Sequence, residues 1–151
     1  MTTGSDLDDR IRLLSRAWLF SGCSEHELER VASLTSPRTA RAGDELTREG
    51  DAGAEFFVVI AGNAVARVED DPVGDLGPGS FFGEMALIDG GERMATVTAT
   101  TDMELLVLDR DDFNEMLEVA MPSVVPKLLA VVGARMRLLE QHAGMAAALG
   151  L

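Results

Sequence analysis

The spacing of apolar residues changes twice along the chain. Ahead of Pro37, apolar residues recur at helical spacing and predict two amphipathic helices. Their apolar positions are Leu7, Ile11, Leu14, Trp18 and Leu19 in the first helix and Leu28, Val31, Ala32 and Leu34 in the second. Ser24 and Glu27 have the spacing of a capping box, which indicates where the second helix begins. From Arg38 to Asp109, short runs rich in Val, Phe, Ile and Thr alternate with glycine-containing turns, which predicts a compact antiparallel barrel or roll.

Helical spacing returns after Asp109, which we expect to cap a helix that ends at Met121-Pro122, because proline disfavours helical geometry in the residue before it. We expect a last helix to begin at Ser123 and to carry two apolar rows. The first row has heptad spacing and comprises Val125, Leu129, Val132, Met136, Leu139, Ala143 and Ala146; the second comprises Val124, Leu128, Val131 and Leu138. The heptad row can pack on the roll and the preceding helix, or pair with a helix of another subunit, and both alternatives stay open.

These patterns divide the chain into an N-terminal helical segment (1–18), a main domain (19–142) and an Ala- and Gly-rich tail (143–151) that we expect to fray. The 151 residues and 46% apolar content are sufficient for one folded domain with a buried core. Three early aspartates argue against a signal peptide, and no apolar run reaches the roughly 18 residues that a membrane span requires. Cys23 is the single cysteine, so we expect no internal disulfide. Together these features predict a cytoplasmic protein with no membrane contact.

Charge and motif content exclude several function classes. The net charge of -13 would repel nucleic acids, so we expect no nucleic-acid partner. The chain lacks a Gly-x-Ser-x-Gly elbow, a Walker-type phosphate loop and a readable metal-ligand cluster. Acidic pairs such as Asp70-Asp71 are more typical of turns than of a general acid and base. We therefore expect a protein that is not an enzyme and has neither catalytic residues nor a metal.

Residues 82–98 contain the most specific chemistry in the sequence. Glu84 and Arg93 lie nine positions apart, on either side of a short apolar turn. Gly83 permits a close approach of the backbone to a ligand, and the free N–H groups of a helical turn at Ala86–Ile88 can bind an anion. Arg93 can add a forked contact to the same anion, although a surface ion pair is the alternative for an arbitrary arginine. A carboxylate repels phosphate, so Glu84 is suited to accept hydrogen bonds from sugar hydroxyls.

The same region resembles the phosphate-binding cassette of the cyclic nucleotide-binding domain family. The resemblance rests on Phe82-Gly83-Glu84-Met85-Ala86-Leu87 followed by Arg93-Met94-Ala95-Thr96-Val97, and on family-like turns at Arg41-Ala42-Gly43-Asp44, Glu49-Gly50-Asp51 and Leu76-Gly77-Pro78-Gly79. It runs nearly continuously from Leu19 to Arg137. It implies an α+β fold: an eight-stranded, jelly-roll-like β-roll with N-terminal helices, a short phosphate-cassette helix and two C-terminal helices.

The resemblance also implies roles for individual residues. Arg93 would bind a cyclic phosphate together with the N–H groups of Ala86, Leu87 and Ala95, and Glu84 with Gly83 would hold the ribose 2'-hydroxyl. The last helix offers Arg135, Met136 and Leu139 as candidates to cover the base. The expected ligand-binding residues are Phe82, Gly83, Glu84, Met85, Ala86, Leu87, Arg93, Met94, Ala95 and Arg135.

Two departures from the family pattern affect the expected ligand and its affinity. Glu92, preceded by Gly90-Gly91, stands where the family often has proline, so we expect a more mobile loop and a modest affinity. Met94 lacks the hydroxyl that can favour guanine, which favours cAMP over cGMP. The predicted function is noncatalytic cAMP sensing that signals through the last helix to an unknown protein partner or to a second subunit of a homodimer. The alternative is a structural dimerisation module whose β-roll no longer binds nucleotide.

Overall fold

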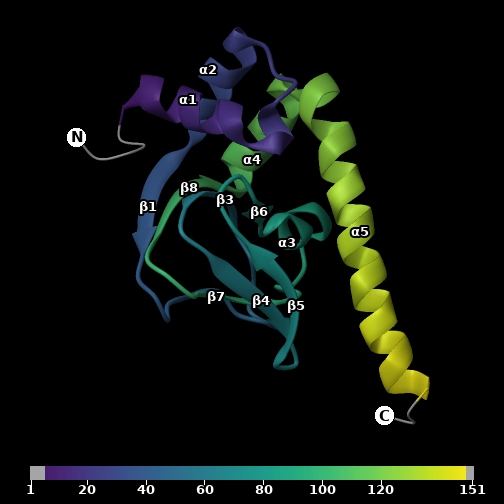
Figure 1. The fold of residues 1–151 in the computed structure, drawn as a ribbon. Helices are drawn as coiled ribbons and strands as arrows, with labels where there is room; N and C mark the ends of the chain where they lie inside the picture. Colours follow the sequence, from purple (N-terminus) through teal and green to yellow (C-terminus); the bar gives the residue numbers. More distant parts are fainter. Residues whose placement is uncertain (1–5, 149–151) are drawn as a thin grey trace.

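The fold is an antiparallel β-roll with helices at one end and one long helix along its side (Figure 1). The computed structural model describes the backbone of residues 6–148 and, apart from that of Asp89, the side chains of residues 6–141. Its helices are α1 (Leu7–Arg16), the 3₁₀ helix η1 (Trp18–Phe20), α2 (Glu25–Leu34), α3 (Glu84–Asp89), α4 (Arg110–Val119) and α5 (Met121–Ala148). Its strands are β1 (Ser36–Ala40), β2 (Glu45–Thr47), β3 (Glu55–Ala61), β4 (Ala64–Val68), β5 (Asp71–Leu76), β6 (Phe81–Phe82), β7 (Thr96–Ala99) and β8 (Met103–Asp109). The predicted α+β class is confirmed.

The roll consists of two four-stranded antiparallel sheets, ordered β1-β8-β3-β6 and β2-β7-β4-β5. Within the first sheet, β3 is covered on both faces, which explains why it is an almost uninterrupted apolar run. Phe57 and Val59 point between the two sheets, whereas Phe56 and Val58 pack against the helices at the end of the roll, and all four are at most 1% exposed. The second sheet therefore forms one wall of the roll interior, with β5 at its edge.

The second N-terminal helix has the predicted cap, whereas the first ends earlier than predicted. Ser24 and Glu27 form the predicted capping box at the start of α2. The first helix was expected to include Trp18 and Leu19, but α1 ends at Arg16 because Ala17 is extended, with φ -77° and ψ 132°. The chain then makes the separate turn η1, which buries Leu19 in the core and leaves Trp18 half exposed.

The helix end predicted at Met121-Pro122 corresponds to the bend between α4, which ends at Val119, and α5. The Asp109 side chain accepts a hydrogen bond from the Asp112 N–H at 2.8 Å and caps α4 as predicted. The axes of α4 and α5 differ by 119°. α5 begins at Met121, two residues before the predicted start, because proline fits the first turn of a helix. Within the described residues no single helix has the length and apolar content of a membrane span; only α4 and α5 combined, across their bend, would meet that test.

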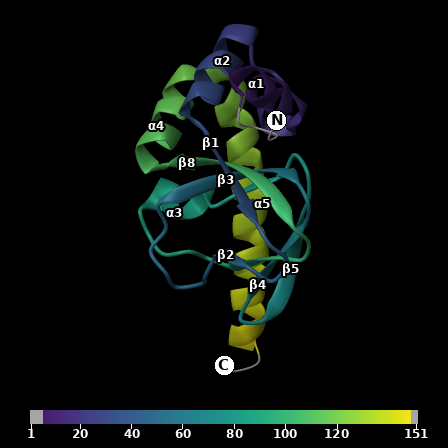
Figure 2. The same ribbon diagram turned by 90° about the vertical axis from the view of Figure 1, so that its left-hand side faces the viewer.

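The second apolar row of α5, and not the heptad row, supplies its fully buried residues. Val124 is 0% and Leu128 is 3% exposed, and both belong to the core under the helices. In the heptad row, Leu129 is 61% and Met136 is 48% exposed. Figure 2 shows α5 extending along the whole height of the roll. The backbone of the predicted tail remains helical as far as Ala148, and residues 149–151 lie outside the described part of the chain.

Candidate functional site

The segment between β6 and β7 begins with a glycine that its backbone conformation requires. Gly83 has φ +94°, and a Cβ added there would lie 2.6 Å from the Glu55 carbonyl oxygen and 2.8 Å from Arg93 Nη1. α3 starts at the next residue and is longer than the single predicted turn at Ala86–Ile88. The N–H groups of a first helical turn have no partner within the helix. The glycine therefore places the backbone and the start of α3 directly beside Arg93.

Arg93 is buried and is held by backbone carbonyl groups. It is 8% exposed, and its Nη1 and Nη2 donate hydrogen bonds to the carbonyl oxygens of Gly83 at 2.9 Å and Glu55 at 2.8 Å. Its guanidinium carbon also lies 5.9 Å from the centre of the Phe57 ring. Burial lowers the pKa of Arg93, although an arginine remains charged at neutral pH. These two bonds occupy two of its five N–H donors, so further donors remain for a ligand. The alternative of an exposed surface ion pair is wrong.

A second glycine, which the sequence did not single out, is packed against the same guanidinium. A Cβ at Gly53 would lie 2.6 Å from the Ala86 Cβ and 2.7 Å from Arg93 Nε. Arg110, the first residue of α4, donates a hydrogen bond from Nη2 to the Gly53 carbonyl at 2.9 Å. The glycine-rich run that contains Gly53 was the available signal, but nothing in it indicated contact with Arg93.

Glu84 and Arg135 form an ion pair between the cassette and the last helix. The Glu84 side chain is 2% exposed and that of Arg135 is 28% exposed. Arg135 donates hydrogen bonds from Nη1 to Glu84 Oε1 at 2.5 Å and from Nη2 to the Phe81 carbonyl at 2.6 Å. Its guanidinium carbon lies 4.9 Å from the centre of the Phe81 ring. α5 is therefore attached to the mouth of the site through the carboxylate that was predicted to face a sugar.

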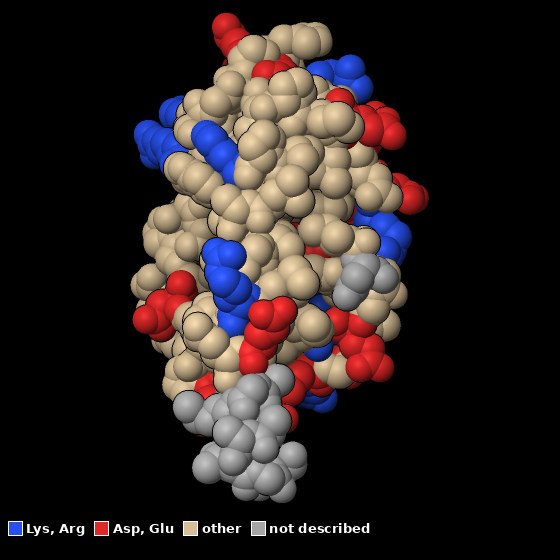
Figure 3. Space-filling model, turned by 90° about the vertical axis from the view of Figure 1, so that its right-hand side faces the viewer, with Lys and Arg blue, Asp and Glu red and all other residues tan. Residues whose placement is uncertain are grey.

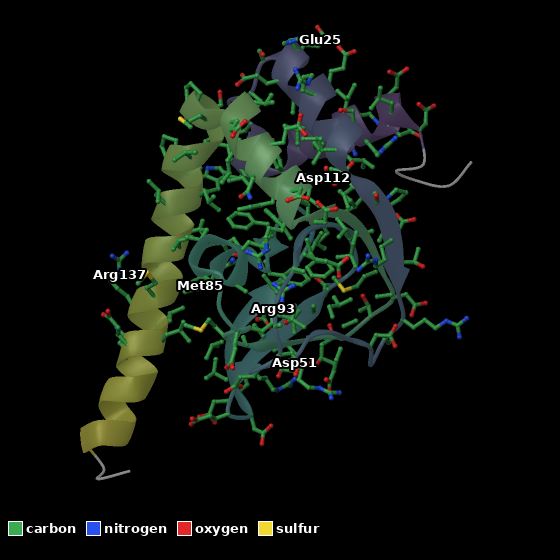
Figure 4. All side chains as sticks on the ribbon, turned by 180° about the vertical axis from the view of Figure 1, so that it is seen from behind. Glu25, Asp51, Met85, Arg93, Asp112 and Arg137 are labelled. Carbon is green, nitrogen blue, oxygen red and sulfur yellow. The ribbon has the colours of Figure 1, made fainter. Side chains whose placement is uncertain are left out.

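Nine of the ten predicted ligand-binding residues line one cavity of about 250 Å³ between the roll and α5. Those that line it are Phe82, Gly83, Glu84, Met85, Ala86, Arg93, Met94, Ala95 and Arg135. In Figure 4, Arg93 lies inside the roll, Met85 lies between the roll and α5, and Arg137 projects from α5 on the side away from the roll. The arrangement joins an anion-binding group, a hydrogen-bond-accepting carboxylate and a largely apolar wall, as a ligand with those three parts would require.

Some predicted residues lie elsewhere, and other lining residues were not predicted. The Leu87 side chain is 6% exposed and packs in the core under the helices, because the helical period of α3 turns it away from the cavity. Met136 is exposed and off the lining, whereas Leu138 and the predicted Leu139 line it. The unpredicted lining residues are Thr47, Ala66, Val68, Val73, Gly74, Asp75, Leu76, Val97 and Leu138. Among the described side chains, His, Cys, Asp and Glu nowhere form a group of three or more that could hold a metal ion.

Comparisons with known proteins show which family and which structures the chain is similar to. Residues 37–119 match the family model of the cyclic nucleotide-binding domain. The cyclic nucleotide-gated potassium channel of Rhizobium etli is 38% identical over 103 residues, which are 68% of this chain and 29% of the channel. The cyclic AMP receptor protein of Thermus thermophilus is 33% identical over 124 residues, which cover 79% of this chain and 57% of that protein. The regulatory domain of Toxoplasma gondii PKA, crystallised with cAMP, is 26% identical with a TM-score of 0.76, and the match covers 85% of this chain and 50% of that structure. The chain thus spans only part of the length of these relatives.

Proposed function

The chain belongs to the cyclic nucleotide-binding domain family, and on this premise we propose that it is a noncatalytic sensor of cAMP. The observation that carries the proposal is the burial of Arg93 and Glu84 on one cavity, with Glu84 bonded to α5. Buried charged groups are costly unless they are paired or serve a ligand. On this mostly apolar cavity, the positive charge of Arg93 matches the phosphate of a cyclic nucleotide, and the carboxylate of Glu84 matches one of its hydroxyls.

The proposed phosphate contacts come from one side of the cavity. Arg93 binds the cyclic phosphate with donors that its carbonyl bonds leave free, and the N–H groups of Ala86, Leu87 and Ala95 complete the anion site. The cavity matters because the net charge of -13 would otherwise weaken the binding of any anion. Charge-assisted hydrogen bonds in a sheltered site are screened less by salt and are stronger than the same bonds in open solvent.

The proposed ribose contact uses the oxygen of Glu84 that Arg135 does not hold. A carboxylate offers about four acceptor positions, and the bond from Arg135 to Oε1 uses one of them. The 2'-hydroxyl donates to the remaining oxygen, and Gly83 contributes its backbone beside it. One carboxylate then contacts both the ligand and α5, which couples ribose binding to the position of that helix.

The base lies in this proposal against aliphatic side chains and not against dedicated hydrogen-bonding groups. Val73, Leu138 and Leu139 line the cavity, and Met94 brings a thioether in place of a hydroxyl. This wall favours cAMP over cGMP, because Met94 offers no hydroxyl to guanine and the hydroxyl of the lining residue Thr47 is already bonded to the Ala95 carbonyl and the Val97 N–H. Arg135, which lies over the Phe81 ring, is the residue of α5 that covers the ligand.

The proposed output passes through α5 because that helix has polar contacts both with the N-terminal helical region and with the cavity. Lys127 donates from Nζ to the Trp18 carbonyl at 3.0 Å, and Ser123 donates from Oγ to Glu27 Oε1 at 3.2 Å. Arg135 links the same helix to the cavity. A ligand that binds one position of α5 more tightly shifts the population toward that position, and a protein partner or second subunit detects the change.

Calorimetric titration of the purified chain with cAMP and cGMP tests the proposal. We expect one cAMP site per chain and weaker binding of cGMP. The absence of heat and of a thermal shift at millimolar cAMP would contradict the sensor function. Incubation with cAMP followed by chromatography tests the noncatalytic part, and conversion of the nucleotide would overturn it.

A second candidate, dimerisation through α5, has support from the exposed heptad row. Leu129 and Met136 are one heptad apart and are 61% and 48% exposed. Figure 3 presents the side of the molecule on which α5 lies in Figure 1. Uncharged surface dominates the upper part of that side, with most charged side chains at its edges and in its lower part. Sedimentation analysis of the wild type and of the Leu129→Glu, Met136→Glu double variant tests this candidate. Dimers that dissociate in the double variant support it, and a wild type that is monomeric at all concentrations contradicts it.

A further inference from the structure

Thr47 combines three properties that set it apart from an ordinary strand residue. It is 7% exposed, it lines the cavity, and it is the last residue of β2. β2 pairs with β7, but the register shifts between Glu45 and Thr47. We propose that Thr47 is a positioning residue that holds the Ala95 N–H in place for the ligand phosphate, an inference that rests on the proposed function.

The Thr47 hydroxyl makes two hydrogen bonds to β7. Oγ1 donates to the Ala95 carbonyl oxygen at 3.0 Å and accepts from the Val97 N–H at 3.2 Å. A register shift interrupts the regular ladder of backbone hydrogen bonds, so the backbone groups beside it need other partners. A threonine hydroxyl has one donor and can also accept, so a single side chain satisfies one group of each kind.

These bonds fix one side of the segment that carries Met94 and Ala95, and backbone bonds fix the other. The Arg93 N–H donates to the Asp51 carbonyl at 2.7 Å, and the Gly50 N–H donates to the Arg93 carbonyl at 3.0 Å. The peptide that carries the Ala95 N–H therefore lies between two anchored residues. Without the Thr47 hydroxyl, one anchor is lost, and the peptide must be ordered when the ligand binds.

A purely structural hydroxyl, which only satisfies the two backbone groups at the register shift, is the alternative. Both alternatives predict lower stability when the hydroxyl is removed, because the Ala95 carbonyl and the Val97 N–H lose their partner. Only positioning predicts that the affinity of the folded protein also falls and that the contact between the Ala95 N–H and the phosphate changes. The cAMP affinity and the contact of the Ala95 N–H must therefore each be measured separately from stability.

The test compares Thr47→Val, which keeps the shape and removes the hydroxyl, with Thr47→Ser, which keeps the hydroxyl. Thr98→Val is the matched control, because Thr98 is a partly buried threonine on β7 outside the cavity lining. Each protein is titrated with cAMP by calorimetry under conditions where chemical denaturation shows it fully folded. We expect about tenfold weaker binding for Thr47→Val and a change below about twofold for Thr47→Ser and Thr98→Val.

A spectroscopic measurement isolates the positioning role. In the nitrogen-15 spectrum of the wild type, saturating cAMP should move the Ala95 amide proton downfield, and Thr47→Val at saturation should show a smaller shift. Equal affinity and an equal Ala95 shift in the wild type and in Thr47→Val would overturn the inference, whereas no cAMP binding by the wild type would instead overturn the proposed function. If Thr47→Val does not fold, the affinity of Thr47→Ser is the deciding measurement. Tenfold weaker cAMP binding by this folded variant, which keeps the hydroxyl, would overturn the role proposed for the hydroxyl.

Discussion

Two arginines face the same cavity from different parts of the molecule and are held in different ways. Arg93 follows the cassette helix and donates to two backbone carbonyls of the roll. Arg135 comes from α5 and donates to a carboxylate, that of Glu84, and to the Phe81 carbonyl. The residue Arg93 is 8% exposed, whereas the side chain of Arg135 is 28% exposed.

In the proposed function, this difference separates a fixed recognition group, Arg93, from a movable cover, Arg135. The partners of Arg93 are the carbonyls of Glu55, in β3, and of Gly83, the residue after β6. β3 and β6 pair in one sheet, so we expect these two partners to stay in place when α5 moves. The partner of Arg135 is a side chain, and α5 can leave it by breaking one ion pair and one carbonyl bond. We therefore expect changes at Arg93 to affect affinity most, and changes at Arg135 to affect the position of α5.

Arg93→Ala should produce the largest effect. Loss of a charge-assisted hydrogen bond to the phosphate should cost about 1.5–3 kcal/mol, or roughly ten- to a hundredfold in cAMP affinity. Arg41→Ala, on the exposed surface between β1 and β2, is the control and should bind as the wild type does. Calorimetry of both variants measures the effect, and equal affinity in Arg93→Ala and wild type would remove Arg93 from the site.

Gly53→Ala should disturb the fixed side without touching the ligand. Its Cβ would overlap the Ala86 Cβ and Arg93 Nε, so the guanidinium must shift. Overpacking of this kind costs about 1–3 kcal/mol of stability, and we expect cAMP affinity to fall with it. Gly22→Ala is the control, since its nearest neighbour would be at 3.7 Å. Chemical denaturation and calorimetry measure the two quantities; a Gly53→Ala protein as stable as the control would show that the roll accommodates the methyl group.

Arg135→Ala should have a smaller effect on affinity and a distinct effect on α5. The variant loses the bond to Glu84 Oε1, but the other carboxylate oxygen can still accept from the ribose, so we expect about three- to tenfold weaker binding. Amide hydrogen exchange in the second half of α5 should become faster. Arg137→Ala, two residues away and exposed, is the control. Unchanged exchange in Arg135→Ala would mean that the ion pair does not hold the helix.

Arg38→Gln should have the smallest effect and should leave the cavity intact. Arg38 donates hydrogen bonds to the Glu55 carboxylate at 3.0 and 2.6 Å, and these hold the pKa of Glu55 below its usual value. The carboxylate of Glu55 therefore binds a proton more tightly in the unfolded chain than in the folded one. The ion pair stabilises the fold above the usual carboxylate pKa, and this stabilisation is lost as the pH falls through the lowered pKa of Glu55.

Because both side chains of this pair are more than a third exposed, solvent screening should keep its contribution below about 1 kcal/mol. Thermal unfolding between acidic and neutral pH should show a flatter dependence in Arg38→Gln than in the wild type. Its cAMP affinity should stay within about twofold, because Glu55 contacts Arg93 through its backbone carbonyl. A tenfold loss would show that the Arg38–Glu55 ion pair influences the Arg93 site.

Contiguous motifs could be predicted from the sequence, whereas contacts between distant segments could not. Gly83, Glu84 and Arg93 lie within one short stretch, where residue type and spacing limit the possible geometry. Capping by Ser24 and Asp109 was predictable for the same reason, because a cap depends on residues three positions away. Thr47 lies far from Ala95 in the sequence, and its role depends on a register shift that the apolar pattern does not encode.

The helices also show that contacts between distant segments cannot be predicted from local spacing. Helical spacing continues past Arg16, but α1 ends there, since η1 buries Leu19 at 1% and Phe20 at 0% exposure. The two rows of α5 are both apolar, so spacing alone could not decide that Val124 and Leu128 would be the buried pair. That choice depends on how α5 lies against the roll and the helices, which is a property of the whole fold.

The crystal structure of the chain with cAMP tests the central claim most directly. We predict purine nucleotide density in the cavity, with the phosphate oxygens within hydrogen-bond distance of the Arg93 guanidinium and the 2'-hydroxyl on Glu84. An empty cavity at saturating cAMP, or a nucleotide whose phosphate lies away from Arg93, would contradict it.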